Sequence, residues 1–475
     1  MALSDDVPLL ERFRFLAISA SNLDEFYQVR VAALHDQIAA EVTDTSPDGR
    51  TPARQRDEIS AWVQHFTDEQ EKLLAKQLFP ALAKHGVHIV RWQRLGKRAK
   101  EALSADFENR IFPILTPLAV DPSHPFPYIS NLALNLAVIA RDPQTLDERF
   151  ARVKVPRNFP RFIAVPDSKD FILLDDLIEA HLDRLFPGME IVTVSRFRVT
   201  RNADLSLDDE DAEDLLAAVE MELRRRRFGR AVRLEVESNI PTAVLDKMCE
   251  ELELERADVI MSGSFVELSS LQQLANLDLP ALRFRPWAPV TAGRLAAAQD
   301  AGRSMFDVIK SRQLLVHHPY ESFSSSTETF VEQAAKDPKV LSIKMTLYRT
   351  SGDSAIARHL IRAAESGKQV AVVLELKARF DEARNVSWGR ELELAGVHVN
   401  YGLVGLKTHA KCILVVREEA GQIRRYVHIA TGNYNSVTAR IYEDIGFFTC
   451  EEAVGRDATQ LFNYLTRYRS EEPHV

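Results

Sequence analysis

Apolar residues in the first hundred positions recur at helical spacing. The first run repeats apolar side chains every three residues, at Leu10, Phe13 and Leu16. A second amphipathic run extends over residues 59–82. Side chains at such intervals share one face of a helix. The pattern predicts that residues 1–110 are mainly helical, and we assign residues 1–83 to an N-terminal helical domain.

The pattern changes after residue 110. Pro113, Pro117, Pro122, Pro125 and Pro127 follow one another closely, and no helix tolerates such a density of proline. Beyond them, short apolar or alternating runs predict strands at 133–140, 161–165, 171–174, 191–199 and 232–237. A charged amphipathic helix is expected at 207–226. These elements predict an α+β middle domain at 111–290.

Strands and helices then alternate in a regular order. Strands are expected at 314–317, 341–348, 370–376 and 397–401. Helices are expected between them at 325–335, 354–365 and 385–395, and a capping box at Ser325 and Glu328 would open the first. This alternation predicts a parallel sheet, to which strands at 410–417 and 425–430 add an antiparallel hairpin. An α/β catalytic domain at 296–475 thus completes a multidomain α and α/β fold.

Composition narrows the class of protein. The 475 residues are 45% hydrophobic and 27% charged, as in ordinary soluble chains. Lys and Arg together number 60 and Asp and Glu 69, so the formal net charge is −9. A net acidic chain is a poor general ligand for nucleic acids or anionic membranes. We therefore expect no nucleic-acid partner, although basic residues can still converge in one cleft for a polyanion.

The cysteines and the N-terminus indicate the compartment. Cys249, Cys412 and Cys450 lie far apart and lack CxxC spacing, which argues against disulfides and against a zinc site. The first residues show no signal-peptide pattern, and no run approaches about 18 consecutive apolar residues. We expect a cytoplasmic protein, with peripheral association with a membrane left open.

Two arginines follow strands of the predicted parallel sheet. Arg349 comes directly after one strand, and Arg379 comes shortly after the next. Ligands gather beyond the carboxyl ends of strands in open α/β sheets, and the guanidinium fork fits phosphate oxygens. Surface ion pairs with Asp353 or Asp381 are the alternative. Two arginines in equivalent positions favour an anion site.

The sharpest local pattern lies at 407–411, where His409 and Lys411 flank one residue at the start of a strand. Alternate residues of a strand point to one face. Folding the hairpin about Gly421 places Asn433 opposite His409. A nucleophilic imidazole, an ammonium group and an amide would then share one pocket, which suits phosphoryl transfer through a phosphohistidine. For an isolated pattern of this kind, a buried structural histidine is the alternative.

A series of specific strings runs in order along almost the whole chain. They lie at 15–26, 116–127, 197–204, 225–230, 317–322, 344–349, 406–411 and 431–442. In this set and order, the sequence resembles the bacterial polyphosphate kinases of the phosphohistidine type. So many specific strings in one order are not expected by chance.

The resemblance implies a fold and an activity. The fold is an N-terminal helical domain at 1–83, an α+β head domain at 84–295 and C-terminal catalytic domains similar to phospholipase D, the first of them at 296–475. The activity is reversible transfer of the terminal phosphate of ATP to inorganic polyphosphate, with Mg²⁺, through a phosphohistidine. ATP, ADP and polyphosphate are the implied ligands. A homodimer formed through the head domain is the implied assembly.

Individual residues match positions of the family. His409 matches its phosphorylated histidine. Asn22 and Tyr442 match nucleotide-binding positions, and Tyr442 would stack on adenine. Arg349 and Arg379 match residues assigned to the Mg²⁺ site. A guanidinium cannot ligate a cation, so we expect both arginines to hold phosphate beside the metal.

The sequence also departs from the family. It stops at Val475, near the expected end of the first phospholipase-D-like domain, and lacks the second such domain and a short leading helix before Val7. A separate chain that carries the last domain is an expected partner, and this sequence alone is expected to be a poor polyphosphate synthase. The alternatives are a polyphosphate- or nucleotide-binding fragment with impaired catalysis and a phospholipase-D-like phosphodiesterase. The second is disfavoured because Val416 stands where that motif requires Asp.

Overall fold

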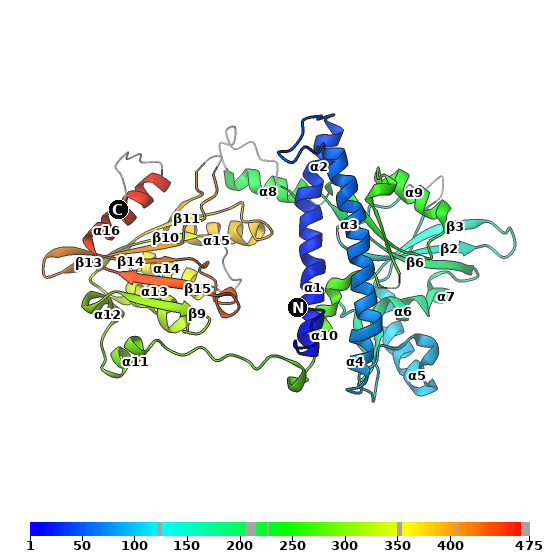
Figure 1. The fold of residues 1–475 in the computed structure, drawn as a ribbon, viewed down its shortest axis with the longest axis horizontal. Helices are drawn as coiled ribbons and strands as arrows, with labels where there is room; N and C mark the ends of the chain where they lie inside the picture. Colours follow the sequence, from blue (N-terminus) through cyan, green and yellow to red (C-terminus); the bar gives the residue numbers. More distant parts are fainter. Residues whose placement is uncertain are drawn as a thin grey trace. The chain divides into compact units, whose positions relative to one another are not determined.

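The computed structural model describes residues 1–120, 126–204, 215–225, 228–263, 265–348, 354–403 and 406–466. The chain forms two compact units (Figure 1). The first unit comprises Met1–Asp204 and Arg226–Arg285, and the second comprises Leu205–Arg225 and Pro286–Val475. The boundary that the sequence predicts between residues 83 and 84 lies within the first unit and stays a prediction.

Helices occupy most of the first hundred residues, as the apolar spacing predicts. They are α1 (Leu9–Phe26), α2 (Ala32–Ala39), α3 (Pro52–Leu73), α4 (Phe79–Ala83) and α5 (Lys97–Asp106). Leu10, Phe13 and Leu16 of α1 are buried in one cluster with Leu271 and Leu274. The three-residue spacing therefore marks the face of α1 that packs on the first unit's core.

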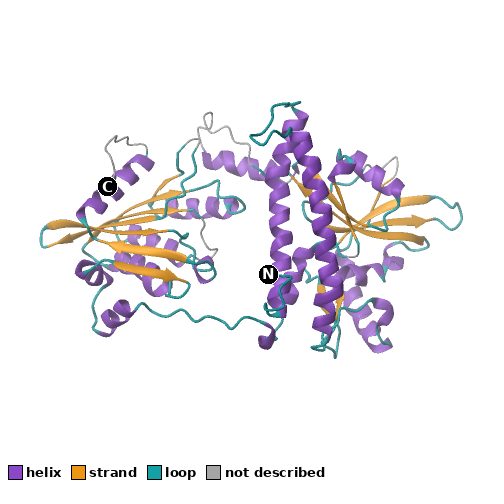
Figure 2. Cartoon of the chain, viewed as in Figure 1, coloured by secondary structure: helices purple, strands orange, loops and turns teal. Residues whose placement is uncertain are grey.

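The head-domain segments form a six-stranded sheet in the order β1-β3-β2-β6-β7-β8 (Figure 2). Its strands are β1 (Leu118–Val120), β2 (Leu134–Arg141), β3 (Glu148–Lys154), β6 (Glu190–Arg201), β7 (Ala231–Glu237) and β8 (Val259–Ser262). Only β7 and β8 are parallel neighbours. A small antiparallel sheet pairs β4 (Phe162–Ala164) with β5 (Phe171–Leu173). The remaining helices are α6 (Leu174–Glu179), α7 (Leu182–Leu185), α9 (Thr242–Leu252) and α10 (Gln272–Ala275).

A buried ion-pair network ties α1 to this sheet. Both oxygens of Asp24 accept hydrogen bonds from Arg198 on β6, at 2.8 and 2.9 Å, and Arg233 on β7 pairs with the same carboxylate. Asp24 is 5% exposed, and the arginines are 2% and 1% exposed. Burial raises the pKa of the Asp24 carboxyl, but the two guanidinium groups outweigh it and hold the pKa below its usual range. Buried ion pairs, in which each charge neutralises another, thus hold α1 against the sheet.

We expect Asp24→Asn to lower the free energy of unfolding of the first unit by about 3–5 kcal/mol, because it leaves one carboxylate, that of Glu235, to pair with two buried guanidinium groups. Since the folded pKa of Asp24 is depressed, its contribution is present above the ordinary carboxyl pKa and is lost as the pH falls through the folded value. Urea unfolding at neutral pH measures the loss. The matched control is Asp5→Asn, whose partner is Arg12 but whose side chain is 91% exposed. Equal losses in the two variants would contradict a special role for the buried network.

The second unit contains a seven-stranded sheet in the order β12-β11-β10-β13-β14-β15-β9. Its strands are β9 (Leu314–His318), β10 (Val340–Leu347), β11 (Gln369–Leu374), β12 (His398–Asn400), β13 (Cys412–Glu419), β14 (Gln422–Ala430) and β15 (Asp444–Thr449). The expected strands and hairpin are confirmed, but the sheet is mixed. Only β10, β11 and β12 are parallel neighbours, and β9 lies at the far edge, antiparallel to β15.

Seven helices accompany this sheet among the described residues of the second unit. They are α8 (Leu215–Arg225), α11 (Gly293–Asp300), α12 (Met305–Ser311), α13 (Thr329–Lys336), α14 (Ala355–Glu365), α15 (Glu382–Leu394) and α16 (Glu452–Leu465). α8, expected within the head domain, belongs to this unit: Glu220 pairs with Arg390 of α15 at 2.7 Å. None of the helices described in either unit is both long and apolar enough to cross a membrane.

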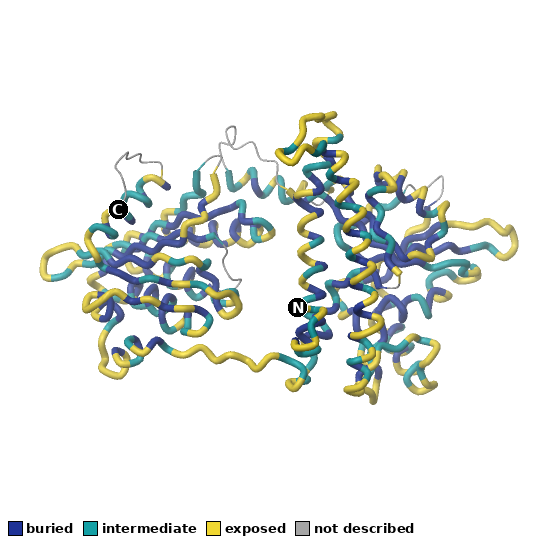
Figure 3. The backbone as a smooth tube through the Cα atoms, viewed as in Figure 1, coloured by how far each residue is buried: buried dark blue, intermediate teal, exposed yellow. Residues whose placement is uncertain are grey.

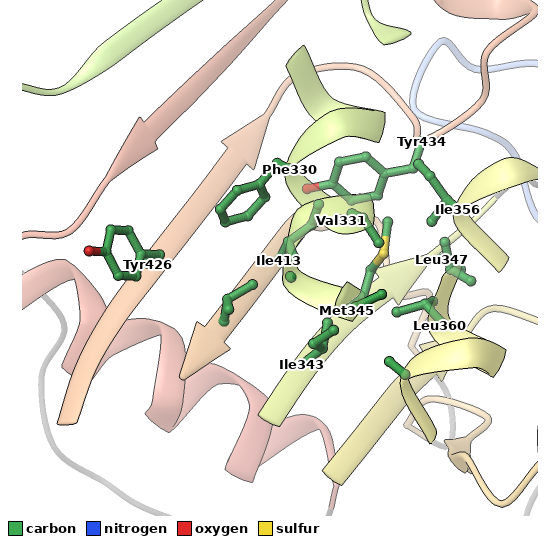
Figure 4. Close-up of a cluster of buried hydrophobic side chains, with 14 of the residues drawn as sticks. Phe330, Val331, Ile343, Met345, Leu347, Ile356, Leu360, Ile413, Tyr426 and Tyr434 are labelled. Atoms are coloured by element: carbon green, nitrogen blue, oxygen red, sulfur yellow. The ribbon is translucent and has the colours of Figure 1, made fainter. Parts of the chain in front are cut away.

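The core of the second unit lies on one face of the sheet. Phe330 and Val331 of α13 and Leu360 of α14 pack there against Met345 and Ile413 (Figure 4). Figure 3 shows the buried backbone concentrated along the central strands of each unit. The opposite face of β13 and β14 is covered by α16, through Ala458 and Phe462 among others.

One helix begins differently from the sequence prediction. The expected capping box at Ser325 and Glu328 does not form. Instead, Ser322 Oγ accepts the Ser325 N–H at 3.2 Å, and residues Ser324–Glu328 form a π-helical turn that leads into α13. A serine three positions earlier than expected thus supplies the local hydrogen bond, because several serines in a row offer the same chemistry.

Candidate functional site

The segment around His409 enters the sheet just before β13 and is tied to β10. Thr346 Oγ1 donates a hydrogen bond to Ala410 O at 2.7 Å and accepts one from the Cys412 N–H at 3.0 Å. Thr346 is 2% exposed. One buried hydroxyl therefore fixes the backbone on both sides of Lys411, where the regular ladder has not yet begun.

A buried carboxylate holds the same segment from the other side. Glu375, the residue after β11, accepts the backbone N–H groups of Thr408 at 2.7 Å and Lys377 at 2.9 Å. Burial raises the pKa of Glu375, and these two N–H donors oppose that rise. The carboxylate therefore joins the end of β11 to the residue immediately before His409.

Asn385 of α15 secures the backbone that follows β10 and β11. Its amide nitrogen donates to Tyr348 O and to Glu375 O, each at 2.8 Å, and the residue is fully buried. The carbonyls it binds follow β10 and β11, so Asn385 satisfies backbone groups that the parallel ladder leaves unpaired. Glu375 and Tyr348 are thereby set at the carboxyl ends of the parallel strands, where such sheets bind ligands.

His409 is exposed and rests edge-on against Tyr348, with ring centroids 5.2 Å apart. Within the described chain, neither ring nitrogen has a hydrogen-bond partner. Partial burial lowers the pKa of His409, and the neighbouring Lys411 ammonium lowers it further. The imidazole is therefore neutral at neutral pH and has a free lone pair, which is the state a nucleophile needs.

Lys411 lies beside the imidazole but is almost enclosed, at 6% exposure. Its Nζ donates to His409 O and stands 5.5 Å from the centroid of the Tyr348 ring. Burial lowers the pKa of Lys411, while Asp444 opposes that shift. Both residues line a pocket of about 610 Å³ whose other walls come from β14, β15 and α16. The structure thus brings His409 and Lys411 together at one pocket.

The predicted pairing of His409 with Asn433 is wrong by one residue. Cys412 faces Ile429 in the β13–β14 ladder, and continuing that register sets Gly432 opposite His409. The reason is the turn: Ala420 and Gly421 form it together, with φ of 50° and 77°, so the hairpin's centre falls between them. Asn433 is half-buried one position further on, and its Oδ1 is enclosed without a hydrogen-bond partner among the described residues.

Gly432 is required at its position by a close approach. The Asp444 carboxylate packs against its Cα, and a Cβ added there would overlap the carboxylate. Thr431 Oγ1 donates to Asp444 Oδ1 at 2.9 Å and accepts the Ile445 N–H at 2.9 Å. The loop that carries Asn433 is therefore fixed to the start of β15.

The other predicted residues are distributed between the two units. Arg379 is half-buried between β11 and α15, and Arg349 lies outside the described residues. Tyr442 is 62% exposed and immediately precedes the β15 region of the second unit. Asn22 belongs to α1 of the first unit, where it lines a cavity of about 710 Å³ with Trp62 of α3.

Several residues that hold or contact the segments around His409 and Asn433 escaped the sequence prediction. They are Thr346, Tyr348, Glu375, Asn385 and Asp444. Glu375 and Tyr348 each follow an apolar strand, as the two predicted arginines do. That position in the sequence could have indicated that Glu375 and Tyr348 also lie near the site. Thr346, Asn385 and Asp444 act on partners distant in sequence, for which the sequence pattern contains no signal.

Three family models and several relatives match this chain. Models described as the polyphosphate kinase N-terminal domain, middle domain and C-terminal domain 1 match residues 1–90, 98–274 and 304–471. Polyphosphate kinase of Synechocystis sp. is 49% identical over 99% of this chain, which covers 68% of it. That of Mycobacterium ulcerans is 50% identical over 98% of this chain, which covers 65% of it.

A solved structure agrees with these relatives. The crystal structure of polyphosphate kinase from Porphyromonas gingivalis matches 100% of this chain with a TM-score of 0.83 and 28% identity, and this chain covers 68% of it. The chain thus spans about two thirds of the length of the relatives it matches. The helical region, the α+β sheet and the α/β sheet with its histidine–lysine pocket define a multidomain phosphotransferase. The chain belongs to the polyphosphate kinase family.

We expect Gly432→Ala to lower the free energy of unfolding of the second unit by about 1–3 kcal/mol, because the added methyl group overlaps the Asp444 carboxylate. Denaturant unfolding measures the loss. Gly293→Ala is the matched control, since a Cβ at that first position of α11 meets nothing within 4 Å. If Gly432→Ala proves as stable as Gly293→Ala, the contact with Asp444 does not constrain this loop.

Proposed function

We propose that this chain forms a phosphohistidine at His409 and thereby transfers the terminal phosphate of ATP reversibly to inorganic polyphosphate. One observation carries the proposal: in a member of this family, an exposed imidazole with a lowered pKa stands on backbone fixed by Thr346 and Glu375. A rigidly placed, neutral imidazole is what nucleophilic attack on phosphorus requires.

The transfer proceeds in two balanced steps. A ring nitrogen of His409 donates its lone pair to the γ-phosphorus, and the bond from that phosphorus to the bridging oxygen breaks, so that ADP leaves with the electron pair. In the second step a terminal oxygen of polyphosphate attacks the same phosphorus. The N–P bond breaks, and its electrons return to the imidazole.

Charge stabilisation comes from groups around the imidazole. Lys411 brings an ammonium group to the pocket, and its small exposure strengthens its interaction with a phosphoryl oxygen. Asn433 contributes an amide on the loop that Asp444 fixes. Arg349 and Arg379 hold further phosphate oxygens with their bidentate forks. Asn22 and Tyr442 bind the nucleotide, Tyr442 through its exposed ring.

Mg²⁺ is the expected cofactor, and the chain's own residues fit it only through phosphate. In the described ranges, no group of three His, Cys, Asp or Glu side chains is arranged to hold a metal ion. Mg²⁺ usually keeps several waters and binds through substrate phosphates with one or two carboxylates. When bound with the nucleotide it would neutralise phosphate charge, beside the arginines proposed above.

The full activity of the longer relatives goes beyond formation of the phosphohistidine. Because the chain spans about two thirds of its relatives, polyphosphate synthesis, a homodimeric assembly and a partner chain all stay predictions. Formation of the phosphohistidine is the half-reaction for which this chain's own residues are proposed. A nucleotide- or polyphosphate-binding role without catalysis is the outcome if that half-reaction fails.

We expect His409→Ala to abolish incorporation of acid-labile, alkali-stable phosphate from γ-labelled ATP, because no nitrogen remains to form the N–P bond. Labelled protein retained on a membrane and washed with acid or alkali gives the measurement. His398→Ala is the matched control, since His398 is exposed on β12 of the same sheet. Persistent acid-labile label in His409→Ala would refute the assignment.

We expect Arg379→Lys to slow phosphohistidine formation by about 10-fold or more, because lysine keeps the charge but loses the bidentate fork. Rapid-quench labelling measures the rate, and urea unfolding of the same variant shows whether stability has changed. Arg384→Lys is the control, since Arg384 forms an exposed pair with Asp381 at 2.8 Å on the same segment. Unchanged labelling in Arg379→Lys would show that Arg379 serves only the local structure.

A further inference from the structure

Three cations of the first unit converge on three consecutive residues, 129–131. Lys154 Nζ donates to Ser130 Oγ at 3.2 Å, and Arg157 donates to Asn131 O at 3.1 Å. Arg201 donates to Ile129 O at 2.7 Å. These cations come from β3, from the loop after it and from β6. A short stretch of backbone thus brings together positive charges that lie far apart in the sequence.

Arg152 adds a fourth cation. It stands two residues before Lys154 on β3, so both side chains share one face, about 7 Å apart along the strand. Arg152 is only 6% exposed, and its Nε donates to Oδ1 of the fully buried Asn135 at 2.8 Å. We call Arg152, Lys154, Arg157 and Arg201 the cation cluster.

The cation cluster differs from the other arginines of this sheet in what it binds. Its hydrogen bonds all go to neutral acceptors, and among the described residues none of its members has a carboxylate within ion-pair distance. By contrast, Arg196, Arg198 and Arg233 each pair with buried carboxylates. Arg152 and Arg201 are buried, and buried charge without a counter-charge is unfavourable, whereas Lys154 and Arg157 are exposed and open to a ligand.

The members of the cluster also oppose one another. Burial lowers the pKa of Arg152 and of Arg201, and it lowers the pKa of Lys154 together with repulsion from Arg152 and Arg157. These shifts are those of cations that an anion would stabilise. They accompany the geometry described above, in a chain whose net charge is −9.

We propose that the cation cluster is a binding site for a chain of bare phosphate groups, in the first unit and apart from the residues around His409. The ligand's identity rests on the function proposed above, which makes inorganic polyphosphate the available phosphate chain. Successive phosphate groups can contact Arg152 and Lys154 along β3, while Arg157 and Arg201 hold neighbouring oxygens. A bare phosphate chain reaches cations as enclosed as Arg152 more easily than a nucleic-acid backbone with its sugars.

The site gives the first unit its own hold on the substrate. A longer phosphate chain presents more oxyanions to the four cations of the cation cluster. Affinity should therefore rise with chain length. The test compares four ligands: inorganic phosphate, tripolyphosphate, long-chain polyphosphate and ATP. The first three differ in the length of the phosphate chain, and ATP adds a nucleoside. The comparison therefore separates a nucleotide site from a polyphosphate site.

The first test is calorimetric titration of residues 1–475 with long-chain polyphosphate at several salt concentrations. We expect Lys154→Gln and Arg157→Gln each to weaken binding about 10-fold or more. Each should also reduce the slope of log affinity against log salt by about one. Arg141→Gln is the matched control: it removes the same charge from β2 of this sheet, but Arg141 is paired with Glu148. If the two cluster variants bind like Arg141→Gln, the proposal is overturned.

The second test uses Arg152→Met, which replaces the guanidinium by a shorter, unbranched apolar side chain and removes its charge. We expect the melting temperature of the free protein to change little, because loss of the hydrogen bond to the buried Asn135 offsets removal of a buried guanidinium without a counter-charge. The rise in melting temperature that polyphosphate causes should shrink. A lower melting temperature for the free protein together with an unchanged polyphosphate effect would make Arg152 a structural residue and refute its role here.

Two further arms separate this inference from the proposed function. The His409→Ala variant should still bind polyphosphate through the cation cluster. Adding Lys154→Gln to that variant should weaken the binding as much as it does in the unaltered chain. If the added substitution has no effect there, the cluster is not an independent site. Absence of phosphohistidine with cluster-dependent binding intact would refute the proposed function and leave this site standing. Equal competition by ATP or by single-stranded RNA would overturn polyphosphate as the ligand.

Discussion

A charge that leaves water must find a partner, and this constraint governs both units. In the first unit, the Asp24 carboxylate pairs with Arg198 and Arg233 and so fixes α1 to two strands of the sheet. In the second unit, the Glu375 carboxylate meets it with two backbone N–H groups. The cation cluster meets it only with neutral acceptors, which is why we assign its counter-charge to a ligand.

Hydrogen bonds of the same kind hold the backbone beneath the exposed His409 side chain, the proposed nucleophile. His409 lies at the end of a strand rather than inside one, yet its neighbours on both sides are anchored, Thr408 by Glu375 and Ala410 by Thr346. Its ring stays exposed, and partial burial together with the neighbouring Lys411 lowers the pKa of the imidazole. Rigid backbone under an accessible ring is the arrangement that covalent transfer needs, with the geometry fixed before the substrate arrives.

Periodic features of the fold could be predicted from the sequence, and long-range contacts could not. The apolar face of α1, the strands of the second sheet and the hairpin all follow from spacing within a few residues. The strand β15 was missed because Gly446 breaks its pattern; a Cβ there would lie 2.7 Å from His428 Nε2. The one-residue error at Asn433 arose because a turn's centre depends on backbone angles at Ala420 and Gly421. Asn385 acts across the fold, so local sequence gives it no signal, whereas Glu375 shares with Arg379 the position after an apolar strand.

Peptide mapping of the phosphorylated chain tests the central claim most directly. Residues 1–475 are mixed with ATP and Mg²⁺, digested under alkaline conditions that preserve N–P bonds, and analysed by fragmentation that retains the phosphoryl group. The account predicts one phosphorylated peptide, with the phosphoryl group on the His409 imidazole. A phosphoryl group on another side chain, with His409 unmodified, would contradict it.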